Sequence, residues 1–269
     1  MTQSARGQAR GVERLYLDFD SFFASAEQHF NPSLRGRPVG VVPLDSPHTG
    51  CIAVSRQAKA LGVKSGAKIK DAKAIIPDMV FVVARHDVYV RLHKRILDVI
   101  DTIIPVTKVR SIDEVVCNLT PREAAEGAAL ATRLKAALAS AFSDTLTCSI
   151  GMAPTELLAK IAAELKKPDG FVLIEADDMP ARLAGIDLDD LPGISKGMHA
   201  RLTAANVHDF SDLWNLAPKQ ARAIWGSVEG ERFWNGIHGY HTERPETKKS
   251  MFGHSRMLPG DWRTPDKVR

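Results

Sequence analysis

The first regular pattern in the chain is a strict alternation of apolar and polar side chains over residues 14–20. The apolar positions are Leu15, Leu17 and Phe19. The polar positions between them are Tyr16, Asp18 and Asp20. Because successive side chains of a β-strand point to opposite faces, this spacing predicts a strand with one buried face and two carboxylates on the other.

Similar patterns predict the elements that follow. Apolar runs predict strands over 38–43, 51–54, 79–84, 146–152 and 171–174. Helical spacing with recognisable ends predicts helices over 21–30, 55–61, 87–103, 120–142 and 155–167, the fourth opened by a capping box at 120–123. Beyond residue 174 the pattern is purely helical, over 179–184, 195–205, 210–216, 218–225 and 229–236. From 242 to 269 periodicity is lost, which is typical of a linker or tail.

An acidic pair, Asp113 and Glu114, lies between two short apolar segments that precede the helix over 120–142. In a straight strand one of these acids would point into the core, where a carboxylate is costly. A hairpin with its turn at Ser111-Ile112 lets both acids project near the tip. Taken alone, such a pair is most often a solvated turn.

The order of elements predicts an α+β fold. With the segment 21–84 set aside, the order is strand, helix, strand, strand, helix, strand, which is the ferredoxin-like arrangement. Its first and third strands are central neighbours. We therefore expect Asp18 to lie close to the Asp113-Glu114 hairpin.

Three carboxylates at one sheet edge would repel each other unless cations neutralise them. Hard divalent cations prefer carboxylate and carbonyl oxygens, and Mg²⁺ commonly shares such a site with substrate phosphates. Two such ions can activate an attacking oxygen and stabilise a leaving one. The pattern therefore predicts a two-metal nucleotidyltransferase centre.

Composition narrows the class of protein. Of the 269 residues, 36 are Lys or Arg and 32 are acidic, giving a net charge of +4 that permits a polyanionic partner without requiring one. The cysteines, Cys51, Cys117 and Cys148, lie far apart and are interpreted as buried free thiols. No apolar run approaches a membrane span and the polar start lacks a signal-peptide core, so we expect a cytoplasmic protein with no membrane partner.

Three motifs in order resemble those of Y-family translesion DNA polymerases of the DinB type. They are LDFDSFFASAE at 17–27, SIDE at 111–114, and SIG at 149–151 with LAKIA at 158–162 and KPDG at 167–170. The similarity extends from about Arg14 to Gly239. It implies a right-handed polymerase with a ferredoxin-like palm, an inserted small fingers domain and an all-helical thumb, which copies primer–template DNA from dNTPs in DNA repair.

The resemblance also implies domain bounds. The palm would span 12–20 and 85–174, the fingers 21–84 and the thumb 175–241, with 242–269 as a linker toward a little-finger domain. Two alternatives stay open: the chain is a catalytic-core fragment, or the protein lacks that domain. The linker favours the fragment. A sliding clamp is a further expected partner, bound through a C-terminal region beyond residue 269.

The family's site residues carry over to matching positions. Asp18, Asp113 and Glu114 would be the catalytic acids that hold two Mg²⁺ ions, or Mn²⁺, with the Phe19 carbonyl as a further ligand. Asp20 would be a structural neighbour. The dNTP would contact Phe22, Phe23, Arg56, Lys59 and Lys160. Among these, Phe23 matches the steric gate against a ribonucleotide's 2′-hydroxyl, with core packing as its alternative, and Lys160 matches a triphosphate-binding lysine, with a solvated helix lysine as its alternative.

Two segments depart from the family pattern. Ala53, Arg56 and Lys59 stand where a hydroxyl residue, a tyrosine and an arginine usually grip the triphosphate. Arg56 and Lys59 share a helix face and can still bind phosphates, although Lys lacks the bidentate fork of Arg. MAPT at 152–155 replaces the family's Ser-x-Asn-Lys. Nucleotide positioning is therefore the open question, more than metal binding.

The segment 191–196, LPGISK, resembles a helix-hairpin-helix that binds DNA without reading its sequence. Gly193 would allow the backbone to come close to the DNA, and Ser195 and Lys196 would contact a phosphate at a helix N-terminus. The alternative is a turn that only connects two helices. For the whole chain two other classes stay open. One is a catalytically weak paralogue that acts as a DNA-binding or partner-recruiting scaffold, and the other is a ferredoxin-like nucleotide cyclase, which leaves the hairpin unexplained.

Overall fold

The computed structural model describes residues 11–242 together with Gly253, Trp262, Thr264 and Asp266. Nearly all of the expected linker over 242–269 lies outside these residues. In the part of the chain that the structure describes, none of the helices has the length and apolar character needed to cross a membrane.

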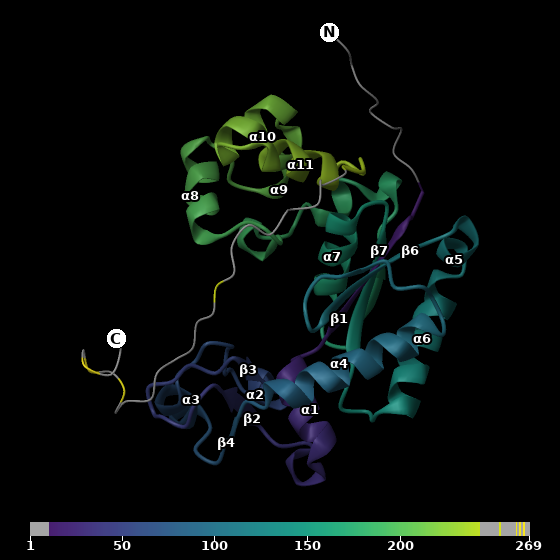
Figure 1. Ribbon diagram of the computed structural model, residues 1–269. Helices are drawn as coiled ribbons and strands as arrows, with labels where there is room; N and C mark the ends of the chain where they lie inside the picture. Colours follow the sequence, from purple (N-terminus) through teal and green to yellow (C-terminus); the bar gives the residue numbers. More distant parts are fainter. Residues whose placement is uncertain (1–10, 243–252, 254–261, 263, 265, 267–269) are drawn as a thin grey trace.

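A five-stranded sheet forms the centre of the molecule (Figure 1). Its order is β5 (Lys108–Val109), β6 (Glu114–Asn118), β1 (Arg14–Phe19), β7 (Cys148–Ala153) and β8 (Phe171–Leu173). All neighbours are antiparallel except β7 and β8. The predicted ferredoxin-like order is confirmed, because β1 pairs with β6 as the first and third strands should.

The two faces of the sheet are covered by different helices. Leu15, Leu17 and Phe19 of β1 belong to the core that includes α4 (His86–Asp101) and α6 (Gly127–Ala141). Tyr16 belongs to a second core with α7 (Glu156–Leu165). On that face a Cβ at Gly151 would lie 2.0 Å from the Ala159 carbonyl oxygen, so only glycine lets α7 pack this closely. The alternation in the sequence therefore places Asp18 on the α7 face.

A smaller unit is inserted between β1 and α4. Its sheet has the order β3 (Ala53–Val54), β2 (Val39–Val42) and β4 (Val80–Val83), and it packs with α2 (Arg56–Ala60) and α3 (Ile69–Ile75) around a separate core. The helix α1 (Phe22–Phe30) and the 3₁₀ turn η1 (Pro32–Leu34) connect it to the larger sheet. The helix α3 was absent from the sequence prediction.

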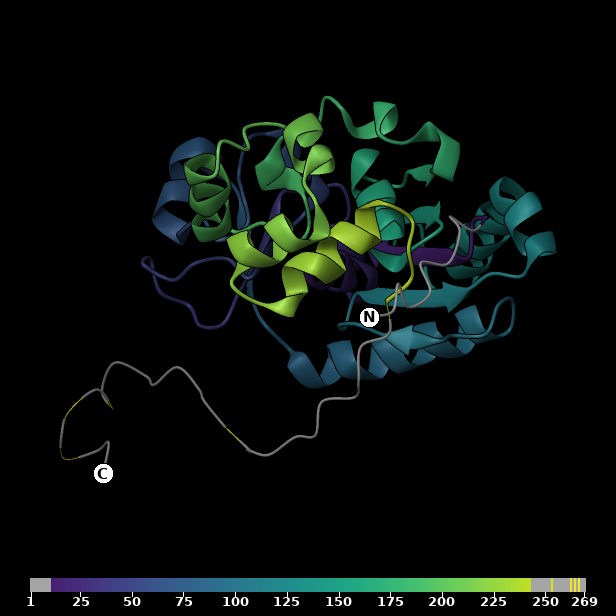
Figure 2. The ribbon, with the colours of Figure 1, turned by 90° about the horizontal axis from the view of Figure 1, so that it is seen from above.

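The last described unit is helical. It contains the 3₁₀ turns η2 (Ala176–Asp178), η3 (Ala181–Leu183) and η4 (Leu188–Asp190), then α8 (Lys196–Ala204), α9 (Phe210–Asn215), α10 (Pro218–Trp225) and α11 (Val228–Ile237). Seen from above it lies over α7 (Figure 2). The Thr155 hydroxyl at the start of α7 donates to the Gly236 carbonyl at 2.7 Å, and a Cβ at Gly236 would lie 2.9 Å from Leu157.

Two predicted helices differ in the structure. The segment 120–142 begins at the predicted capping box but divides into α5 (Pro121–Ala125) and α6, with the break at Glu126. Gly127 follows the break and packs against Met152 and Leu173, where an ideal Cβ would lie 2.9 Å from the Met152 sulfur. The expected helix over 179–184 is instead the short 3₁₀ turn η3, which is set between glycine, proline and acidic turn residues that do not sustain a longer helix.

Candidate active site

Asp18 and Glu114 are cross-strand partners at the end of the β1–β6 pair. The next residue, Phe19, donates its backbone N–H to the carbonyl of Asp113 at 2.9 Å. Asp18 is buried, whereas Asp113 and Glu114 are half-buried. The proximity that the fold order predicted is therefore confirmed at the level of register.

The turn before β6 brings the two other acids together. Arg110 closes it by donating its backbone N–H to the Glu114 carbonyl at 2.9 Å. The Ser111 hydroxyl donates to Asp113 Oδ1 at 2.6 Å and lies 3.2 Å from Glu114 Oε2. The predicted hairpin at Ser111 is confirmed, and its serine holds both acids near the tip.

Two lysines neutralise the acids. Lys160 Nζ on α7 lies 2.5 Å from Glu114 Oε1, and Lys167 Nζ just beyond α7 lies 2.9 Å from Asp18 Oδ2. Among the described residues no three His, Cys, Asp or Glu side chains are arranged as a ready metal site. The metal site at these carboxylates stays a prediction, and in this structure the ammonium groups of Lys160 and Lys167 pair with Glu114 and Asp18.

The two paired acids have opposite pKa shifts. Burial raises the pKa of Asp18 to about 7, against the opposing effect of Lys167 and with a smaller contribution from the negative charge of Asp113. Burial also acts to raise the pKa of Glu114, but hydrogen bonds from Lys160, Tyr16 and Ser111 outweigh it, so that this pKa is lowered. A cation beside Asp18 would therefore favour its ionised form and displace a proton below about pH 7.

The donor chemistry at this edge fits a hard divalent cation. Asp18, Asp113 and Glu114 offer carboxylate oxygens, the ligands that Mg²⁺ prefers. Phe19, whose carbonyl was the fourth expected ligand, is the last residue of β1. The negative charge that pairs with Lys160 and Lys167 is the same charge that would pair with metal.

Asp20 has a different role from Asp18, although the alternation places both on one face. Its carboxylate accepts hydrogen bonds from the Thr147 hydroxyl at 2.8 Å, the Ser149 hydroxyl at 2.9 Å and the Asp169 backbone N–H at 2.8 Å. These donors make it an anchor for the loop after α7.

The two phenylalanines of α1 are placed differently. Phe22 is buried in the core beside Phe19, and its contact with a dNTP stays a prediction. Phe23 is half-buried, and its ring centroid lies 4.8 Å from that of Tyr89. The Tyr89 hydroxyl donates to Glu27 at 2.7 Å. One side of the Phe23 ring thus packs against Tyr89, and part of the ring is exposed to solvent.

The predicted phosphate-binding residues of the small unit lie on α2. Ser55 caps this helix through the Ala58 N–H, Arg56 is half-buried and Lys59 is exposed. Arg56 and Lys59 lie on a different element from the acids. The helix α1, which follows β1, packs against β2 and β3, and β3 leads directly into α2.

The predicted DNA-binding hairpin is a turn before α8. Gly193 has φ +95°, the left-handed region that favours glycine, and Ser195 caps α8 through the Met198 N–H at 3.3 Å. Lys196 is the first residue of α8. The element before the hairpin is the 3₁₀ turn η4, so the expected pair of α-helices is reduced to one, because Pro192 and the acids of η4 leave too few residues for a full helix.

Lys167 and Tyr16 were missed as site residues by the sequence analysis. A signal for Lys167 was available, because it follows Lys160 by seven residues, two turns of a helix, and therefore falls on the same face. The only sequence signal for Tyr16 was its place on the polar face of β1, two residues before Asp18.

Comparison with known proteins gives one family. Residues 17–164 match the family model described as the impB/mucB/samB family. The chain is 34% identical over 260 residues to DNA polymerase IV of Metallosphaera sedula, covering 94% of this chain and 74% of that protein. It is 33% identical over 263 residues to DNA polymerase IV of Moorella thermoacetica, covering 94% of this chain.

The chain spans 65% of the length of the Moorella protein and 50% of DNA polymerase IV of Pelotomaculum thermopropionicum. Among solved structures, it resembles DinB from Sulfolobus solfataricus with a TM-score of 0.73 and 27% identity, covering 86% of this chain and 68% of that one. It resembles an insertion ternary complex of Dbh DNA polymerase with a TM-score of 0.75 and 28% identity, covering 87% and 69%.

Proposed function

The chain belongs to the impB/mucB/samB family, the DinB-type Y-family DNA polymerases, and we propose that it catalyses template-directed, low-fidelity DNA synthesis in translesion repair. The substrates would be a primer–template DNA and a dNTP. The observation that carries the proposal is the register of Asp18 against Glu114, with Asp113 at the adjoining turn, on a ferredoxin-like sheet.

Asp18, Asp113 and Glu114 would hold two Mg²⁺ ions, with Mn²⁺ as a substitute, together with the Phe19 carbonyl. When bound, such ions activate the primer 3′-hydroxyl and stabilise charge on the triphosphate. The chain's own part is to supply and neutralise negative charge. Lys160 and Lys167, which pair with Glu114 and Asp18, are the cations best placed to turn toward a bound triphosphate.

Other residues would position the substrates. Phe23, supported by Tyr89, would occupy the space of a ribonucleotide's 2′-hydroxyl. Arg56 and Lys59 on α2 would contact the triphosphate from the inserted unit, since no carboxylate partner of either is found among residues 11–242. The turn at Gly193 and Ser195 would bind a DNA phosphate without reading sequence.

In this proposal the large sheet with α4, α6 and α7 is the palm, the inserted unit over 21–84 is the fingers, and the helical unit over 175–241 is the thumb. The contact with a sliding clamp stays a prediction. The scaffold alternative is supported by Ala53, which lies in the core without a hydroxyl group, but the three acids and their register favour the enzyme.

Primer extension tests the proposal. Wild-type protein with Mg²⁺ or Mn²⁺ is expected to extend a labelled primer along its template, and Asp113→Ala/Glu114→Ala is expected to lose at least about a hundredfold in rate because the metal ligands are removed. Asp98→Ala, an exposed acid on α4, is the matched control and should extend normally. No extension by wild type with either metal, while DNA is still bound, would favour the scaffold.

A further inference from the structure

The loop between α7 and β8, residues 166–170, carries Lys167 into the acid cluster. Lys167 Nζ lies 2.9 Å from Asp18 and 2.7 Å from Glu164. Asp169 has φ +55°, and an ideal Cβ at Gly170 would lie 1.7 Å from the Lys166 carbonyl oxygen. The loop is therefore tightly wound, and its conformation decides where the Lys167 ammonium lies.

One side of this loop is fixed by Asp20. The Asp169 backbone N–H donates to Asp20 Oδ2 at 2.8 Å, and the Thr147 hydroxyl donates to the same oxygen at 2.8 Å. Asp20 is buried at 4% exposure. A carboxylate two residues from Asp18 in the chain thus holds the loop that brings Lys167 to Asp18.

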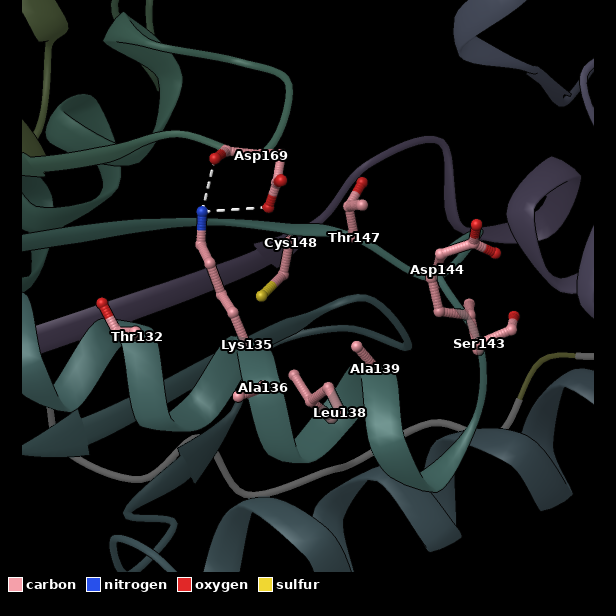
Figure 3. A pocket seen from close by; sticks show the side chains of 11 residues that line it. Thr132, Lys135, Ala136, Leu138, Ala139, Ser143, Asp144, Thr147, Cys148 and Asp169 are labelled. Carbon is pink, nitrogen blue, oxygen red and sulfur yellow. Dashed lines mark hydrogen bonds and ion pairs between the residues drawn. The ribbon is translucent and has the colours of Figure 1, made fainter.

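The other side is fixed by Lys135, which reaches the loop from α6 (Figure 3). Its ammonium donates to the Gly170 carbonyl at 2.9 Å and to the Asp169 carbonyl, and lies 3.0 Å from Asp169 Oδ1. An ammonium has three N–H donors, and three loop oxygens surround this one. The contacts fix the orientation of two consecutive peptide groups.

A cavity of about 410 Å³ lies beside this contact, lined by Lys135, Asp169, Thr147 and Cys148 among others. Lys135 therefore crosses an open space and is not packed on all sides. Because the Asp169 side chain is 52% exposed, water screens its ion pair with Lys135, and the pair contributes little to global stability. Its effect is expected to be local, on the loop it holds.

We propose that Lys135 is a positioning residue for the candidate active site: it holds the 166–170 loop so that Lys167 stays beside Asp18. The inference rests on the proposed function where it concerns nucleotide binding. Without Lys135, the loop would keep the bond from the Asp169 N–H to Asp20 and the bond from the Ile150 N–H to the Gly170 carbonyl at 3.1 Å, but the Asp169 peptide would be held less tightly and Lys167 would sample positions away from Asp18. The incoming dNTP would then be bound less tightly, while the acids themselves would be unchanged.

The test compares Lys135→Met, Lys135→Arg and the control Arg133→Met on the same helix. Methionine keeps an apolar stem of similar length without the donors, and arginine restores charge and donors. Arg133 is 53% exposed and pairs with Glu126, away from the loop. Hydrogen–deuterium exchange over residues 166–171 and single-dNTP insertion kinetics are measured on each variant, together with the thermal midpoint.

Lys135→Met is expected to speed exchange in this loop about tenfold and raise KM for dNTP about tenfold, with kcat within about twofold and an unchanged thermal midpoint. Lys135→Arg should recover most of both effects, and Arg133→Met should match wild type. Unchanged loop exchange in Lys135→Met would overturn the inference, as would an unchanged KM in an active enzyme. If wild type extends no primer but the loop exchange still rises only in Lys135→Met, the proposed function fails and the loop contact stands.

Discussion

Phe23 is a single ring whose place can be tested by substrate choice. Its ring centroid lies 4.8 Å from that of Tyr89 and 6.3 Å from that of His86. These rings limit how far the Phe23 side chain can move. Phe23→Ala is expected to lower the preference for dNTP over rNTP by at least about tenfold, because space opens for a 2′-hydroxyl. The preference is measured as the ratio of kcat/KM values for dCTP and CTP opposite template dG.

Phe30→Ala is the matched control for this variant, since Phe30 ends the same helix and is 42% exposed. It should leave the preference for dNTP unchanged. An unaltered preference in Phe23→Ala would remove the gate role from Phe23 and leave it as a packing residue.

For single residues, the positions of the acids could be predicted from the sequence better than the lysines that hold them and their loop. Asp18, Asp113 and Glu114 could be predicted, because strand alternation and a turn place them at one edge. Lys135 could not be predicted, and Lys167 only through its seven-residue spacing from Lys160, because the contacts of both lysines depend on how a loop closes after α7. Asp18 and Asp20 share a face in the pattern, and only the donors around Asp20 separate them.

At the element scale, α1 is joined to the start of α4 by a buried charge. Glu27 is 2% exposed and accepts from Arg85 at 3.0 and 2.6 Å and from Tyr89 at 2.7 Å. Arg85 is the residue at which the chain returns from the inserted unit. This pair therefore sets the position of the inserted unit relative to the large sheet.

Glu27→Gln is expected to lower the free energy of unfolding by about 2 kcal/mol, since charged hydrogen bonds are lost in a buried place while Arg85, 44% exposed, is partly solvated. Urea denaturation measures this change. Asp87→Asn is the matched control, because the Asp87–Arg91 pair on α4, the helix that Arg85 precedes, is exposed and its loss should leave the midpoint unchanged. Equal midpoints for both variants would contradict a structural role for Glu27.

Most elements could be predicted from periodicity and end signals. Apart from β5 and β6, for which no range was predicted, the strands lie within a few residues of their predicted ranges, as do α4, α7, α8, α10 and α11. The helix α3 was missed because its seven residues carry two lysines and an aspartate and only a short apolar stripe. The break at Glu126 was not predicted from the continuous helical pattern over 120–142.

For the whole molecule, the order of elements was sufficient for the topology of the large sheet. It required setting aside 21–84, which the structure shows as a unit with its own core. The packing of the helical unit on α7 was not predictable, because it depends on Gly236 and Thr155, whose contact joins residues far apart in the sequence. The acids lie on the α7 face of the sheet, the same face on which that unit packs.

In the proposed function, Asp18, Asp113 and Glu114 together make metal-dependent nucleotidyl transfer possible. The most direct test of this role is the single-turnover rate of one dNTP addition, measured against Mg²⁺ concentration for wild type and Asp113→Asn. Asparagine keeps the shape of the side chain and removes the charge. We expect a rate that saturates with Mg²⁺ in wild type and is at least about a hundredfold lower in Asp113→Asn, with equal DNA affinity. Equal rates and equal Mg²⁺ dependence in the two proteins would contradict this role.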